Sequence, residues 1–260
     1  MNAEMIFEQD DRGIGLLRFN RPQVRNALSW SAMECFRDLI EQAYDDRDLR
    51  VLILTGDKRA FCAGGDLAEL HSHLSRVDGV RLMTLMGEAL NRLAEFPAPT
   101  IAAIEGAAMG GGAEISLACD MRVLAEDAHI GLMHVRLAIS PAWGGALRLL
   151  RTVGYARAFE WLVAGRVLTG EQAYRYGLAN RLTPPGQAMA EARALAETIA
   201  AYDPAAVHAI KRMLRAGRTL DPSSAAAAER REFPVLWAAP AHTQASADFI
   251  ARKQSRSARA

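Results

Sequence analysis

The sequence predicts an α/β core followed by a helical C-terminal region. Up to about residue 150, short apolar runs alternate with stretches of helical periodicity. From Gly154 onward the helical stretches follow one another without strand signals. This order, together with a length of 260 residues of which 50% are hydrophobic, predicts one large domain with a helical appendage. We place the core at residues 1–200 and the helical region at residues 201–260.

The expected strands are short and rich in aliphatic residues. We predict them at residues 13–19, 51–55, 101–104 and 121–125. The run VLILT at residues 51–55 is typical of a strand buried on both faces. Helices are predicted at residues 31–45, 79–95, 155–164, 170–177, 186–201, 204–217 and 221–232. The first of these helices begins with a capping-box pattern, Ser31 to Glu34.

Composition excludes several classes of partner. The chain has 31 Lys and Arg against 30 Asp and Glu, which does not favour nucleic acid or acidic membranes. No apolar run reaches the roughly 18 residues of a membrane span, and we expect no signal peptide. The three cysteines lack CxxC spacing and are expected to be free thiols of a cytoplasmic protein.

Two glycine-rich turns stand out, and each follows an apolar run. The second turn, residues 110–112, opens a helical stretch that contains Glu114. Glycines at a helix start leave backbone N–H groups uncovered, and the absence of Cβ atoms allows a ligand to approach them. The first turn contains Gly64 and Gly65. If the turns lie side by side, each donates one N–H to the same oxygen atom, which makes an oxyanion hole with Glu114 as a proton carrier nearby.

The order of these and other motifs resembles the enoyl-CoA hydratase/isomerase (crotonase) superfamily. The matching pieces are NRP at 20–22, NAL at 26–28, AFCAGGDL at 60–67, GAAMGGGAE at 106–114, CD at 119–120, the loop from Pro141 to Gly144-Gly145, and FIARK at 249–253. The resemblance implies a spiral of strand–strand–helix units. It also implies an acyl-CoA substrate, no further cofactor, and C-terminal helices that form trimers, which can pair into hexamers.

The resemblance also assigns roles to residues of the site. The N–H groups of Gly65 and Gly111 would form the oxyanion hole for a thioester. Glu114 would be one of the two glutamates that hold water and transfer the proton in its addition to a 2-enoyl double bond. The implied CoA-binding residues are Arg25, Ala27, Ala63, Asp66 and Leu67.

Two residues depart from the family pattern. His134 stands where the second glutamate is expected, and Trp143 lies in the Pro-x-x-Gly-Gly loop, where a large ring would narrow the acyl pocket. A histidine can also hold water and transfer a proton. We therefore predict that His134 takes over part of the second glutamate's work; the alternative is a histidine that only lines the pocket or the core.

Hydration of 2-enoyl-CoA is the first hypothesis for the reaction. Double-bond isomerisation and decarboxylation of malonyl-type thioesters are the alternatives, although Glu114 would repel a substrate carboxylate. A non-catalytic acyl-CoA-binding protein is a further alternative. Asp66 is interpreted mainly as a helix cap. No metal site is expected at His71 and His73, because no third ligand is evident.

Overall fold

The computed structural model describes residues 4–257 of the chain. They form two compact units, one that ends at Ala200 and one that begins at Ala201. Within the described residues, no helix combines the length and the apolar character that a membrane crossing requires.

The first unit contains two sheets. The larger one has six strands in the order β1-β2-β3-β5-β7-β10, and all its neighbours are parallel except β1 and β2. Its strands are Met5–Gln9, Ile14–Phe19, Val51–Thr55, Thr100–Ile104, Met121–Ala125 and Arg181–Thr183. The smaller sheet has four strands in the order β4-β6-β8-β9. Its strands are Ala60–Cys62, Ala107–Met109, His129–Gly131 and Leu168–Thr169.

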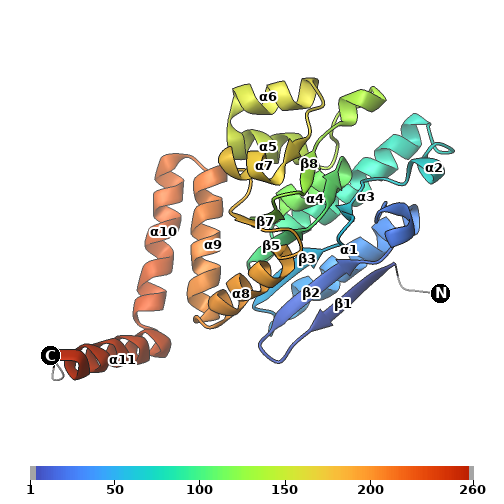
Figure 1. The fold of residues 1–260 in the computed structure, drawn as a ribbon. Coiled ribbons are helices and arrows are strands. Elements are labelled where there is room, and N and C mark those ends of the chain that lie inside the picture. Colours follow the sequence, from blue (N-terminus) through green and yellow to red (C-terminus); the bar gives the residue numbers. More distant parts are fainter. Residues whose placement is uncertain (1–3, 258–260) are drawn as a thin grey trace. The chain divides into compact units, whose positions relative to one another are not determined.

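The two sheets arise from a repeated strand–strand–helix unit. The pair β3 and β4 is followed by α2 (Leu67–Leu70) and α3 (Arg76–Ala94), and the pair β5 and β6 by α4 (Gly111–Ala118). The pair β7 and β8 is followed by the short helix η2 (His134–Leu137) and α5 (Gly145–Val153). In each repeat the first strand joins the large sheet and the second joins the small one. The chain therefore winds as a spiral, with the repeats side by side (Figure 1).

Burial explains why these segments form their elements. Every residue of β3 and β5 is buried, as their continuous apolar sequences predict. Helix α1 (Trp30–Asp45) places Met33, Phe36 and Ile40 in the core at helical spacing. Helix α4 is buried along its whole length, which removes it from solvent on every side. Burial of this apolar surface is the main favourable contribution to folding.

The structure corrects two predictions about local order. Strands do not stop after Gly154, because β9 and β10 follow it. Each has two or three residues, too few to show an alternating pattern, and each forms by pairing with an earlier strand. The cap of α1 is also different: Ser29, not Ser31, accepts a hydrogen bond from the Ala32 N–H at 3.1 Å.

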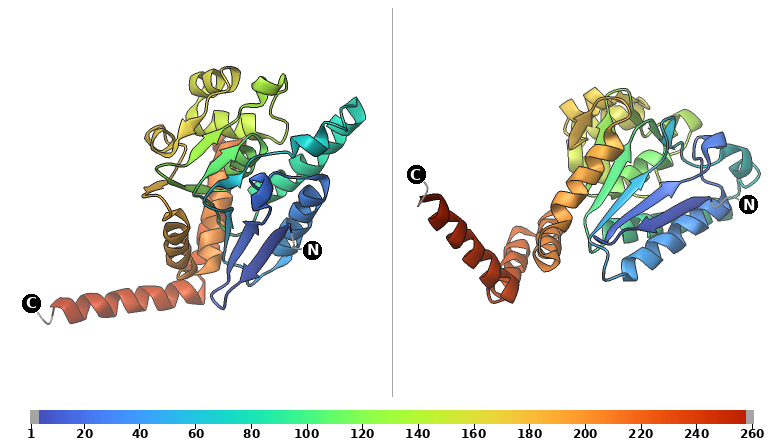
Figure 2. Two further views of the ribbon diagram at one scale, coloured as in Figure 1. Left: turned by 45° about the vertical axis from the view of Figure 1, so that its right-hand side comes forward. Right: turned by 60° about the horizontal axis from the view of Figure 1, so that its bottom comes forward.

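The remaining helices of the first unit are α6 (Tyr155–Val163), α7 (Gly170–Arg175) and α8 (Ala188–Ala200). The second unit consists of α9 (Pro204–Thr219), α10 (Pro222–Trp237) and α11 (Pro240–Ser257). Helices α9 and α10 lie side by side, and Arg212 forms hydrogen bonds of 2.8 and 2.7 Å with both carboxylate oxygens of Glu232. Figure 2 shows α11 leaving this pair as a separate helix.

Candidate active site

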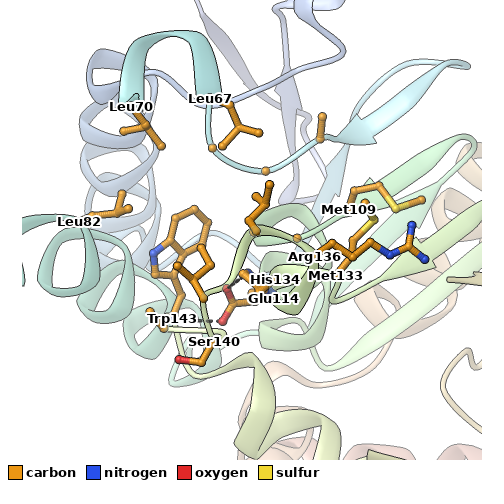
Figure 3. Close-up of a pocket in the computed structure, with 18 residues that line it drawn as sticks. Leu67, Leu70, Leu82, Met109, Glu114, Met133, His134, Arg136, Ser140 and Trp143 are labelled. Atoms are coloured by element: carbon orange, nitrogen blue, oxygen red, sulfur yellow. Dashed lines mark hydrogen bonds and ion pairs between the residues drawn. The ribbon is translucent and has the colours of Figure 1, made fainter. Parts of the chain in front are cut away.

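A cavity of about 240 Å³ opens between the two glycine turns, α3 and the loop from Met133 to Trp143 (Figure 3). Its wall is mostly apolar. The large apolar side chains that line it are Leu67, Leu70, Leu82, Met109, Met133, Leu137, Ile139 and Trp143. The polar side chains in the wall are Glu114, His134, Arg136 and Ser140. A concave apolar site with few polar groups is typical of a binding site for a small molecule.

The two glycine turns are in direct contact, as the sequence predicts. They follow β4 and β6, which are parallel neighbours in the small sheet, so both turns leave the same sheet edge. Gly64 has a φ of +92°, and a Cβ built on it would lie 3.0 Å from the Gly111 nitrogen. Only glycine allows this backbone conformation and this approach without strain.

Gly65 and Gly111 lie one in each turn, and both line the cavity. Leu28 forms an isolated parallel β-bridge with Gly65. The Leu28 N–H donates to the Gly64 carbonyl, and the Leu28 carbonyl accepts from the Asp66 N–H, both at 2.8 Å. The N–H of Gly65 itself therefore points away from Leu28, and Gly65 lines the cavity. Gly111 is the first residue of α4, where an N–H has no partner within the helix.

Glu114 is the buried carboxylate of this cavity. Its side chain is 1% exposed. Oε1 accepts hydrogen bonds from the backbone N–H groups of Trp143 and Gly145, each at 2.9 Å. Oε2 lies 3.1 Å from Nε2 of His134. Gly145 is required beside this carboxylate, since a Cβ there would lie 2.4 Å from Cγ of Glu114.

His134 lies beside Glu114, so the structure brings the sequence-predicted pair together. The imidazole is 11% exposed, and its Nδ1 is buried without a hydrogen-bond partner in the described structure. His134 is the first residue of η2, which begins shortly after β8 ends at Gly131.

A buried arginine fixes the loop that holds Glu114. Arg148 donates to the Trp143 carbonyl at 2.7 Å, to the Leu90 carbonyl at 3.0 Å and to Oδ1 of Asn91 at 2.9 Å. These bonds tie α5 and the loop before it to the end of α3. The backbone N–H groups that bind Glu114 are thereby held in place.

The sequence model of the Enoyl-CoA hydratase/isomerase family matches residues 9–254 of the chain. The chain belongs to this family of enzymes. The resemblance inferred from the motifs is thus confirmed.

Individual relatives agree with this membership. The chain is 32% identical to a probable enoyl-CoA hydratase of Mycobacterium tuberculosis, with 97% of both chains covered. It is 40% identical to the mitochondrial enoyl-CoA hydratase domain-containing protein 2 of Homo sapiens, over 84% of this chain and 76% of the relative. The crystal structure of enoyl-CoA hydratase from Bacillus anthracis superposes with a TM-score of 0.92 at 31% identity, covering 96% of this chain and 97% of that one. The crotonase-type spiral is therefore confirmed.

The predicted CoA-binding residues of this enzyme do not all line the cavity. Ala63 and Leu67 lie in its wall. Arg25 and Ala27 do not line it. Arg25 instead contacts a wall residue from behind, because its carbonyl accepts a hydrogen bond from the Ala63 N–H at 3.1 Å. Asp66 occupies the N-cap position of α2, but its side chain makes no cap bond.

The interpretation of Asp66 as a side-chain cap is therefore wrong. Its Oδ2 instead pairs with Nη1 of Arg21 at 3.2 Å. Arg21 also bonds to the Ala27 carbonyl. The carboxylate is thus oriented by a charge-assisted hydrogen bond to the guanidinium instead of by the helix terminus.

Some parts of the site were not predicted. The backbone donors of Trp143 and Gly145 to Glu114 were missed, although the glycine-containing loop at residues 141–145 was a signal. Four further wall residues were also missed, since their sequences look like ordinary helix faces: Leu70 of α2, Leu82 of α3, and Arg136 and Leu137 of η2. Across the described residues, no cluster of three or more His, Cys, Asp or Glu has the arrangement of a metal site.

Proposed function

We propose that this enzyme hydrates a 2-enoyl-CoA thioester to the 3-hydroxyacyl-CoA. The observation that carries the proposal is the position of Glu114. It is a nearly fully buried carboxylate in the wall of an apolar cavity that also contains the backbone of Gly65 and Gly111.

In this proposal the thioester oxygen accepts hydrogen bonds from the N–H groups of Gly65 and Gly111. Negative charge develops on this oxygen as water adds to C3, and donors already in place stabilise it without reorganisation. Loss of one such donor typically lowers kcat by about 10²- to 10³-fold. The helix dipole of α4, whose first residue is Gly111, favours the same charge.

Glu114 carries the proton. Oε1 is occupied by two backbone donors, so Oε2 faces the reaction. A water molecule donates to a remaining lone pair of Oε2. As the water oxygen bonds to C3, Glu114 takes its proton and the π electrons move through C2 to the thioester oxygen. The protonated Glu114 then delivers the proton to C2, so that H and OH have been added across the double bond.

Turnover of crotonyl-CoA by the wild type and by Glu114→Gln tests this proposal. Glutamine keeps the size of the side chain but cannot take up the proton, and we expect kcat to fall by about 10²- to 10⁴-fold. Glu88→Gln, an exposed glutamate of α3, is the matched control and should keep full activity. Hydration that survives Glu114→Gln unchanged would refute the assignment.

Isomerisation of a 3-enoyl-CoA to the 2-enoyl-CoA is the second candidate. It requires one base that removes a proton from C2 and returns it to C4. The observation that favours it is that Glu114 is the one carboxylate in the wall of the cavity among the described residues. Incubation with 3-hexenoyl-CoA and with methylmalonyl-CoA, followed by mass spectrometry and by absorbance of the conjugated product, separates isomerase, hydratase and decarboxylase.

We further propose that the second unit mediates assembly of a homotrimer in the cytoplasm. The support is the number of large apolar side chains that it exposes. They are Ile210, Leu214, Leu220, Phe233, Val235, Trp237, Phe249 and Ile250. Sedimentation velocity of the wild type and of Phe233→Asp with Trp237→Asp tests this: three or six copies are expected for the wild type, and dissociation for the variant. A wild-type monomer would overturn the assembly proposal.

A further inference from the structure

We propose that His134 is a positioning residue, which fixes Glu114 through an Nε2–H donor and exchanges no proton with the substrate or with water. The inference rests on the proposed function, in which Glu114 carries the proton. It changes the role expected for the residue that stands in place of the second family glutamate.

The hydrogen-bond partners decide which ring nitrogen carries the proton. A neutral imidazole has one N–H and one lone pair. Nε2 faces Oε2 of Glu114 at 3.1 Å, while Nδ1 is buried without a partner. A proton on Nδ1 would leave a buried N–H unsatisfied and would turn the Nε2 lone pair toward a carboxylate oxygen, both of which are unfavourable. The tautomer with Nε2–H is therefore the one that fits.

In this tautomer the ring has no atom that can act as a base toward water. Nε2 holds its proton and points it at Glu114. Nδ1 has the lone pair, but it is buried and has essentially no contact surface for a water molecule. A second glutamate would hold a water molecule with its own oxygens; His134 in this arrangement holds only the first glutamate.

The result is a carboxylate with donors on both oxygens. Trp143 and Gly145 supply backbone N–H groups to Oε1, and His134 supplies Nε2–H to Oε2. The donors come from two separate segments, the loop at residues 143–145 and η2. Together the three donors restrict rotation of the Glu114 side chain. The free lone pair on Oε2 therefore keeps a fixed direction. A group held this way loses little entropy on reaching the transition state.

Two substitutions of similar polarity separate positioning from proton transfer. In His134→Gln the amide nitrogen reaches the place of Nε2, so it can donate to Oε2 but cannot exchange a proton. In His134→Asn the shorter side chain brings its amide only to the place of Nδ1, and the contact with Glu114 is lost. We expect His134→Gln to keep kcat within about threefold of the wild type. We expect His134→Asn to lower kcat by about 10- to 100-fold with little change in KM, since a misdirected catalytic group typically costs up to about 10²-fold.

Equal losses of kcat in both variants would overturn the proposal and would make His134 an acid/base. Retention of full activity in both would also overturn it, because Glu114 would then need no such donor. Thermal unfolding of each variant separates these results from a loss of folded protein.

Crystal structures of the two variants provide a readout that does not depend on turnover. Glu114 should keep its rotamer in His134→Gln and adopt a different or disordered one in His134→Asn. An unchanged rotamer in His134→Asn contradicts positioning even if no substrate is turned over. Absence of hydration by the wild type would contradict the proposed function separately.

Discussion

The indole ring of Trp143 lies directly on the backbone of Gly111. A Cβ built on this glycine would meet Cζ3 of the ring at 2.0 Å and Cη2 at 2.5 Å. Trp143 is itself buried, and its ring forms part of the cavity wall. The same contact limits the cavity on one side and makes glycine a requirement at the start of α4.

Gly111→Ala should therefore reduce activity strongly. The added methyl group must displace either the indole or the backbone of residue 111, and the N–H then misses the thioester oxygen. We expect kcat for crotonyl-CoA to fall by about 10²-fold or more. Gly79→Ala on α3 is the control, because nothing lies within 4 Å of its Cβ position and alanine favours a helix. Normal kcat in Gly111→Ala would contradict the assigned donor.

Trp143→Ala should shift the preference toward longer acyl chains. The ring fills space beside the proposed reaction centre, and its removal extends the cavity past Gly111. Each methylene newly buried contributes about 0.8 kcal/mol. We expect the ratio of kcat/KM for decenoyl-CoA to that for crotonyl-CoA to rise at least about tenfold. An unchanged ratio would mean that the acyl chain does not extend toward the ring.

Arg148→Met should lower both stability and activity. The substitution leaves the Trp143 and Leu90 carbonyls without this donor, and each unsatisfied buried group costs about 1–3 kcal/mol. We expect Tm to fall by about 5 °C or more, and kcat to fall because the loop that holds Glu114 is loosened. Arg151→Met, an exposed arginine of the same helix, should change neither value by much. Equal effects of the two substitutions would rule out the role given to Arg148.

Cys62 should make the protein sensitive to alkaline pH. Burial raises the pKa of this thiol from 9.0 to about 12. The folded state therefore keeps the thiol protonated where the unfolded state ionises it. Its contribution to stability is complete below pH 9, and it is lost as pH rises from about 9 to 12. Tm of the wild type should fall more between pH 8.5 and about pH 10.5 than Tm of Cys62→Ala. Parallel curves would show that the thiol does not contribute.

The larger elements of the fold were predictable because their sequence patterns are local. The expected strands at residues 51–55 and 121–125 coincide with β3 and β7, and the predictions for α8 and α9 agree within about two residues. Helix α10 continues to Trp237 instead of ending at residue 232, and α11 was not predicted. The small sheet was not expected. Its strands have two or three residues, and they are stable only because each repeat of the spiral sets its strand beside the previous one.

The parts of the site that depend on backbone conformation were predictable from the sequence. The contacts between side chains were less predictable. Glycines mark both turns in the sequence, since the contact between them requires glycine at Gly64 and the contact with Trp143 requires it at Gly111. Glu114 follows from its position one helical turn later. The pairing of Asp66 with Arg21 was hidden, because 45 residues separate the two and only the fold brings them together. The orientation of the His134 ring was hidden for the same reason.

The spiral distributes the site over three consecutive repeats. The first supplies Gly65, the second supplies Gly111 and Glu114, and the third supplies His134 with the loop that holds Glu114. In the proposed function, thioester activation thus belongs to the first two repeats, and control of the proton carrier belongs to the third. Because each repeat has its own loop after the short strand, evolution can replace the third loop without altering the donors to the oxygen. New reactions on the same activated thioester can arise by exchange of one loop.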